Sequence, residues 1–86
     1  MKATGATLSD QCRSLGLQIG DTIEGTDETG ETARLTLQWI GDEIAVFRVT
    51  ELCIVATGDT EWTRPMQSAD WNLSYREWRL VEGGAA

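Results

Sequence analysis

The sequence predicts a mainly β fold, either a small SH3-like barrel or a curled antiparallel sheet, with one short N-terminal helix. Apolar and polar residues alternate over residues 32–39, which is the period of a half-buried strand. A Gly-Asp pair at 41–42 separates this segment from a second β-rich segment that reaches residue 50, as in a hairpin. The 86 residues suffice for a single domain over 1–86, with an ordered core over about 8–81 and a flexible tail over 83–86.

The central hairpin, residues 32–50, is expected to close through a tight two-residue turn. That turn pairs Trp39 with Ile44 and Leu35 with Arg48. In this register Trp39 belongs to the core and Arg48 projects into the inner row. A charge at such a position needs a partner or the rim of a cavity, so a structural ion pair and a ligand phosphate are both open for Arg48.

A short helix is predicted over residues 8–15. Thr7 and Asp10 have the spacing of a helix N-cap, in which the hydroxyl accepts a backbone N–H and the acid lies at the positive end of the helix. Apolar residues follow at helical spacing, and Gly16 is a natural residue to end the helix.

The remaining segments are shorter. We expect a frayed lead over 1–6, a turn and first strand over 17–25, an acidic loop over 26–31, an apolar segment over 52–56 that continues the third strand or forms a separate one, a turn over 57–60, an extended segment over 61–63, a loop over 66–70, a short strand over 71–73, a turn or 3₁₀ corner over 74–77, and a last strand over 78–81.

Composition disfavours several classes of function. The net charge is −7, whereas a surface for duplex nucleic acid or for an anionic membrane needs clustered Lys and Arg. The chain has no histidine, the commonest general base and metal ligand, and it has no catalytic or phosphate-loop motif. We therefore expect no enzyme, no cofactor and no metal site. Cys12 and Cys53 are expected to be free thiols of a cytoplasmic protein.

Four tryptophans in so short a chain are the most unusual feature of the composition, and three of them have an arginine nearby. An indole face beside a guanidinium suits a planar ring that carries phosphate. The alternative is that these rings complete the core or an oligomer interface. The candidate ligand-binding residues are Arg34, Arg48, Trp62, Trp71, Arg76 and Trp78.

Five acids and no base lie among residues 20–31, namely Asp21, Glu24, Asp27, Glu28 and Glu31. Most acidic loops are solvated surface, and that is one interpretation here. The functional alternative is a protein-binding surface in which the acids imitate a phosphate backbone and occupy a DNA-binding enzyme.

Several segments resemble a group of small, uncharacterised proteins from the accessory regions of tailed bacteriophages. They are residues 15–25 (Leu-Gly-Leu-Gln-Ile-Gly-Asp-Thr-Ile-Glu-Gly), 33–37 (Ala-Arg-Leu-Thr-Leu), 70–73 (Asp-Trp-Asn-Leu) and 76–78 (Arg-Glu-Trp). The resemblance covers about residues 8–81 and is weakest over 50–61. Phage accessory proteins of this size are often non-enzymatic antagonists of host defence, which hold a nucleotide signal or bind a defence protein. The resemblance implies this context and assigns no role to single residues.

Residues and resemblance together predict a non-enzymatic, phage-type binding protein that forms a homo-oligomer. Its most concrete form sequesters a nucleotide-like immune signal through tryptophan stacking and arginine–phosphate contacts. One alternative is a protein-binding inhibitor of a host defence protein or DNA-binding enzyme, using the acidic loop or a tryptophan-rich surface. A structural phage component is the third hypothesis.

Overall fold

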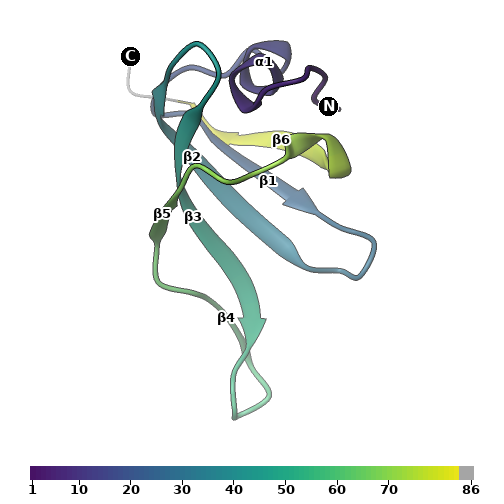
Figure 1. The fold of residues 1–86 in the computed structure, drawn as a ribbon. Helices are drawn as coiled ribbons and strands as arrows, with labels where there is room; N and C mark the ends of the chain where they lie inside the picture. Colours follow the sequence, from purple (N-terminus) through teal and green to yellow (C-terminus); the bar gives the residue numbers. More distant parts are fainter. Residues whose placement is uncertain (84–86) are drawn as a thin grey trace.

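The computed structural model describes residues 1–83 and contains a six-stranded antiparallel open sheet with one short N-terminal helix. The strands are β1 (Thr22–Thr26), β2 (Thr32–Ile40), β3 (Ala45–Ile54), β4 (Thr60–Trp62), β5 (Met66–Ser68) and β6 (Glu77–Glu82). Their order is β4-β3-β2-β1-β6, and β5 pairs with β3 beside β4 (Figure 1). The predicted mainly β class is confirmed as an open sheet, and the sheet does not close into a barrel. The predicted tail at 83–86 lies outside the described residues, except for Gly83.

Helix α1 (Leu8–Ser14) forms where local signals predicted it. The hydroxyl of Thr7 accepts the backbone N–H of Asp10 at 3.1 Å, and Gly16 ends the helix with a φ of 70°. The helix packs against the turn between β2 and β3, where the Ser9 hydroxyl donates to the Ile44 carbonyl at 2.7 Å. Helix α1 therefore lies at the end of the sheet that carries the β2–β3 turn (Figure 1).

The register of the central hairpin differs from the predicted one by one residue. Leu35 pairs with Val49, and Leu37 pairs with Phe47. The connection between the strands is four residues long, not two, and a bulge interrupts β2 between Leu37 and Trp39. Because side chains alternate along a strand, this shift moves every β3 side chain to the opposite face.

Two predictions of the inner row are therefore wrong. Trp39 was expected in the core, but 49% of it is exposed, and its ring lies against Gly41 at the end of β2. Arg48 was expected in the inner row opposite Leu35, but it pairs with Thr36 and its side chain is exposed.

The C-terminal third also departs from the prediction in two places. Residues 66–68 were expected as a loop but form β5, which pairs with the first half of β3. Residues 71–73 were expected as a strand, yet Leu73 begins a 3₁₀ helix, η1 (Leu73–Tyr75). The side chain of Asn72 accepts the backbone N–H of Ser74 at 3.0 Å, which caps this turn and ends any extended conformation. The predicted last strand and the turn before β4 are confirmed.

The N-terminal lead, expected to fray, runs beside β6. The terminal ammonium of Met1 donates to the Trp78 carbonyl at 2.8 Å, and Lys2 forms an isolated bridge with Glu77. Ala3 is buried in the core.

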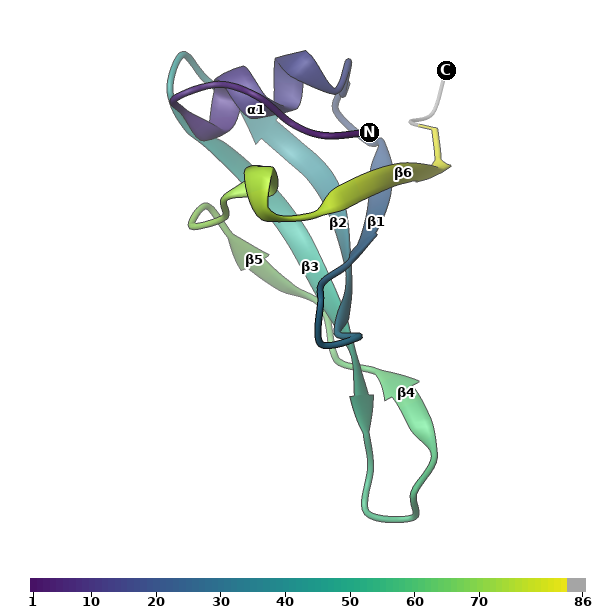
Figure 2. The ribbon, with the colours of Figure 1, turned by 90° about the vertical axis from the view of Figure 1, so that its right-hand side faces the viewer.

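The core lies between the inner face of the sheet, α1 and η1. It comprises Ala3, Cys12, Leu15, Ile23, Leu35, Leu37, Ala45, Phe47, Val49, Leu73 and Trp78. Gln11 joins α1 to η1, because its side-chain oxygen accepts the Leu73 N–H at 2.7 Å. At the other end of the molecule, β4 and the last residues of β3 project away from α1 as a two-stranded arm (Figure 2).

Candidate functional site

The face of the sheet opposite α1 carries a cluster of polar side chains, which we call the outer-face cluster. Its members are Thr22, Glu24, Arg34, Thr36, Arg48 and Thr50. They alternate with buried residues along β1, β2 and β3, so they share one side of the sheet. Strand pairing sets them in two rows, with Thr22 opposite Thr36 and Glu24 opposite Arg34.

A pocket of about 240 Å³ opens in this cluster. It is lined by Thr22, Arg34, Thr36, Arg48, Thr50 and Pro65. Two arginines and three threonines line one small volume. Guanidinium groups donate charge-assisted hydrogen bonds to oxyanions, and hydroxyl groups can donate as well. The lining therefore suits a phosphate-sized anion.

Arg34 is held in place from two sides. Its Nε donates to Glu24 Oε2 at 2.8 Å, and its guanidinium lies 4.2 Å from the centre of the Trp62 ring. These contacts use Nε and the face of the guanidinium, and among the described residues the two terminal nitrogens have no hydrogen-bond partner. Arg34 therefore presents free donors in a fixed orientation.

Arg48 has no ion pair or side-chain hydrogen bond within residues 1–83, and its side chain is exposed beside the pocket. The neighbouring hydroxyls of Thr22 and Thr36 lie 2.7 Å apart and share one hydrogen bond, which leaves one hydroxyl hydrogen available to a third group. Of the two interpretations left open for Arg48, the ion pair finds no support among these residues.

Arg76 lies on the inner side of the sheet, where its guanidinium is already bound to other residues of the chain. Arg76 donates to the Gly25 carbonyl at 3.2 Å and contacts Asp27 Oδ2 at 3.5 Å. Its guanidinium lies 5.5 Å from the Trp71 ring and 5.9 Å from the Trp78 ring. Arg76 thus ties the β1–β2 loop to a pair of tryptophans, as a structural clamp does.

Trp78 is part of that clamp and of the core. It is 1% exposed, its Nε1 donates to the Leu73 carbonyl at 2.8 Å, and the edge of Trp71 packs against it with ring centres 6.2 Å apart. Neither face of Trp78 is open to a ligand. The six predicted ligand-binding residues therefore separate into two groups on opposite sides of the sheet, with Arg34, Arg48 and Trp62 on the outer side.

The predicted acidic surface is smaller than the sequence indicated. Hydrogen bonds from Arg34 and Arg79 lower the pKa of Glu24 below 4.5. Asp27 accepts hydrogen bonds from the hydroxyl and N–H of Thr29, and the hydroxyl contributes most to the lowering of the pKa of Asp27.

Asp21 accepts the Gln18 N–H at 2.9 Å, so it too has a structural contact. Glu28 and Glu31 are exposed, and no ion pair to either carboxylate occurs within residues 1–83. Two of the five acids are therefore open to an external partner.

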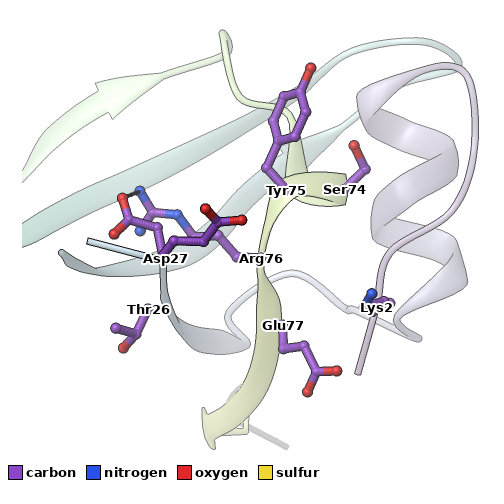
Figure 3. A pocket seen from close by; sticks show the side chains of 8 residues that line it. Lys2, Thr26, Asp27, Ser74, Tyr75, Arg76 and Glu77 are labelled. Carbon is purple, nitrogen blue, oxygen red and sulfur yellow. Dashed lines mark hydrogen bonds and ion pairs between the residues drawn. The ribbon is translucent and has the colours of Figure 1, made fainter. Parts of the chain in front are cut away.

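Glu28 lines a second hollow, of about 400 Å³, between the β1–β2 loop and η1. Figure 3 shows the Arg76 guanidinium beside Asp27 in this hollow and the ring of Tyr75 pointing away from them. Tyr75 is 80% exposed. The hollow thus combines an exposed aromatic ring with a lining of three acids (Asp27, Glu28 and Glu77) and two bases (Lys2 and Arg76), a small excess of negative charge.

Sequence reasoning missed the three threonines, Pro65 and Arg79 as neighbours of the site. Arg79 donates to Glu24 Oε1 at 2.7 Å from β6. The apolar character of Phe47 and Val49 was the available signal, because these residues belong on the inner face and place Arg48 and Thr50 on the outer one.

No group of three metal-binding side chains occurs in the described part of the chain. Cys12 and Cys53 are free thiols, as predicted, and burial raises the pKa of Cys12 to about 11, which keeps it protonated and unreactive. No helix between residues 1 and 83 has the length and apolarity to cross a bilayer.

Comparison with protein-family models, with curated proteins and with solved structures finds no match for this chain. The functional proposal therefore depends on the chemistry of the outer-face cluster and on the resemblance described above.

Proposed function

We propose that this protein binds a phosphate-bearing, nucleotide-like ligand on the outer face of its sheet and retains it without chemical change. In this proposal it is a phage-type protein of the host cytoplasm that counters host defence by sequestering an immune signal. The observation that carries the proposal is the pocket in which Arg34 and Arg48 meet three threonine hydroxyls.

The size of the pocket defines which part of the ligand it takes. A volume of about 240 Å³ is below the roughly 300–1,000 Å³ that encloses a drug-sized ligand. It accommodates a phosphate group, so the base lies outside. Arg34 already stacks on Trp62, and a base continues this stack on the other face of the guanidinium.

Isothermal titration calorimetry with AMP, GMP and adenosine tests the proposal. Wild-type protein should bind both nucleotides and not the nucleoside. Arg48→Ala should weaken nucleotide binding at least tenfold, since a charge-assisted hydrogen bond contributes about 1.5–3 kcal/mol. Lys2→Ala is the matched control, because it removes one exposed positive charge outside the pocket. Equal affinities of these two variants would contradict the proposal.

We also propose that the protein is a homo-oligomer, since a domain of 86 residues gains stability from association. Native mass spectrometry of protein purified gently from a host with nucleotide-signalling defence tests both points. An oligomer with added mass in the nucleotide range supports the proposal. A ligand-free monomer counts against it.

The second candidate function is inhibition of a defence protein or DNA-binding enzyme through the acidic loop. The hollow in Figure 3 favours it, because Tyr75 and Glu28 both line this hollow and the exposed ring of Tyr75 suits a basic side chain of a partner. Replacing Glu28 and Glu31 by glutamine should then weaken a salt-sensitive complex in a pull-down and leave AMP binding unchanged. A complex of unchanged strength would exclude this loop as the interface.

A further inference from the structure

We propose that Glu24 limits the affinity that each phosphate group beyond the first adds, so that the outer face binds mono-, di- and triphosphate ligands about equally tightly. This inference rests on the proposed phosphate-binding function and assigns its weak dependence on ligand charge to one residue. Glu24 does not line the pocket itself, but its carboxylate is bound to Arg34, which does, and to Arg79.

The geometry of Glu24 is that of a shared counter-ion. Its Oε2 accepts from Arg34 Nε at 2.8 Å, and its Oε1 accepts from Arg79 Nη2 at 2.7 Å. Both contacts follow from strand pairing, because Glu24 lies opposite Arg34 on β2 and opposite Arg79 on β6. The Glu24 side chain is 14% exposed, whereas the side chains of Arg34 and Arg79 are 39% and 70% exposed.

Glu24 binds two arginines that line different hollows of this face. On one side, Arg34 lines the phosphate-sized pocket. On the other, Arg79 lines a separate hollow of about 320 Å³ together with Glu24 itself. Arg48 is the arginine of the outer-face cluster that has no acidic partner among residues 1–83.

The consequence is a limit on the affinity that further phosphate groups add. One phosphate group contacts the unpaired guanidinium of Arg48 and the terminal nitrogens of Arg34. A second or third phosphate extends past Arg34 into the field of the Glu24 carboxylate. Like charges a few ångströms apart repel by about 1 kcal/mol even at high effective dielectric, so each added phosphate gains little.

Titration with inorganic phosphate, pyrophosphate and tripolyphosphate tests the inference. For wild-type protein we expect the three dissociation constants to lie within about threefold of one another. Glu24→Gln keeps the shape and one acceptor but removes the charge, so it should tighten pyrophosphate and tripolyphosphate binding about tenfold and phosphate binding no more than about threefold. Glu28→Gln, an equal change in net charge on an exposed loop residue, should change none of them by more than twofold.

Arg79→Ala provides a second, independent variant. The Arg79 side chain is 70% exposed, so its removal should preserve the fold, as circular dichroism checks. Loss of Arg79 leaves Glu24 less neutralised. The inference then expects pyrophosphate to bind at least threefold more weakly, with a smaller loss for phosphate.

The outcomes separate the inference from the function on which it rests. If wild-type protein binds phosphate and Glu24→Gln gains nothing for pyrophosphate, the inference is wrong and the proposed function stands. If neither protein binds any probe, both are wrong. Binding by Glu24→Gln alone supports the role of Glu24 and counts against phosphate binding by the native protein.

Discussion

Replacement of Gly25 by alanine tests the packing of the inner face. Gly25 lies on β1 directly beneath the Trp78 ring, and a Cβ there would lie 2.7 Å from Cε3 and 2.9 Å from both Cδ2 and Cζ3. The ring has little freedom to move away, because it is 1% exposed and its Nε1 is bonded to the Leu73 carbonyl at 2.8 Å. The Trp78 ring or the β1 backbone must therefore shift to admit the new methyl group.

The magnitude follows from two opposing effects. Overpacking of a well-packed site costs about 1–3 kcal/mol. Alanine in a strand is more stable than glycine by about 0.5–1 kcal/mol, because it loses less backbone entropy on folding. This gain applies at Gly25, whose φ is not positive and so does not strain alanine. We expect a net loss of about 1–2 kcal/mol in the free energy of unfolding. For a domain of this size, this lowers Tm by about 4–15 °C.

Urea unfolding followed by tryptophan fluorescence measures this loss. Gly83→Ala is the matched control, because a Cβ at that position meets no atom within 4 Å. Trp78→Phe in the Gly25→Ala background should recover part of the loss, as a double-mutant cycle reports. If Gly25→Ala lies within 0.5 kcal/mol of the control, the close approach of β1 to Trp78 is refuted. Phosphate binding should be unchanged in Gly25→Ala, because the new Cβ faces away from the outer-face cluster.

Four further predictions concern stability. Burial raises the pKa of Cys12 from 9.0 to about 11, so the folded state holds this proton more tightly. Stability should be full below pH 9 and fall by roughly 2 kcal/mol by pH 11, and Cys12→Ala should remove this fall in urea unfolding. Folding lowers the pKa of Glu24, so its contribution to stability depends on pH in the opposite direction: it is complete above pH 4.5 and is lost as pH falls through the folded-state pKa. In an acid titration followed by circular dichroism, the loss of stability with falling pH should be smaller for Glu24→Gln. Gln11→Ala leaves the buried N–H of Leu73 without its acceptor and should cost about 1–3 kcal/mol in urea unfolding. Trp39→Ala should cost about 1 kcal/mol in the same measurement, well below the 3–5 kcal/mol of a core tryptophan, because this side chain is 49% exposed.

Local signals predicted the helix, because its ends depend on residues a few positions apart. Thr7 accepts the N–H of Asp10 whatever the rest of the chain does, and Gly16 takes a left-handed conformation at low cost. Local signals also predicted the first strand, the turn at 57–60 and the last strand. The strand at residues 66–68 was not predicted, since β5 is only three residues long and forms by pairing with β3, which is distant in sequence.

The register of the β2–β3 hairpin was predicted wrongly because of the turn and a bulge. A two-residue turn and an unbroken β2 were assumed, whereas the turn has four residues and a bulge precedes Trp39. A slip of one residue exchanges the two faces of a strand. The alternation itself favoured the correct choice, since Phe47 and Val49 are more apolar than Arg48 and Thr50. Turn length outweighed this pattern, and Arg48 was placed on the wrong face.

The same reasoning explains why the net charge of −7 is a poor guide to this site. Charges act over about 8 Å at physiological ionic strength, so the face that a ligand meets matters more than the sum over the chain. Strand alternation and pairing bring Arg34 and Arg79 together around the single carboxylate of Glu24, and they leave Arg48 unpaired beside them. Many of the acids lie elsewhere, in the β1–β2 loop and at the turns. An acidic protein can therefore present a basic face, and under the proposed function the affinity of that face for an anion depends on how much of its positive charge Glu24 neutralises.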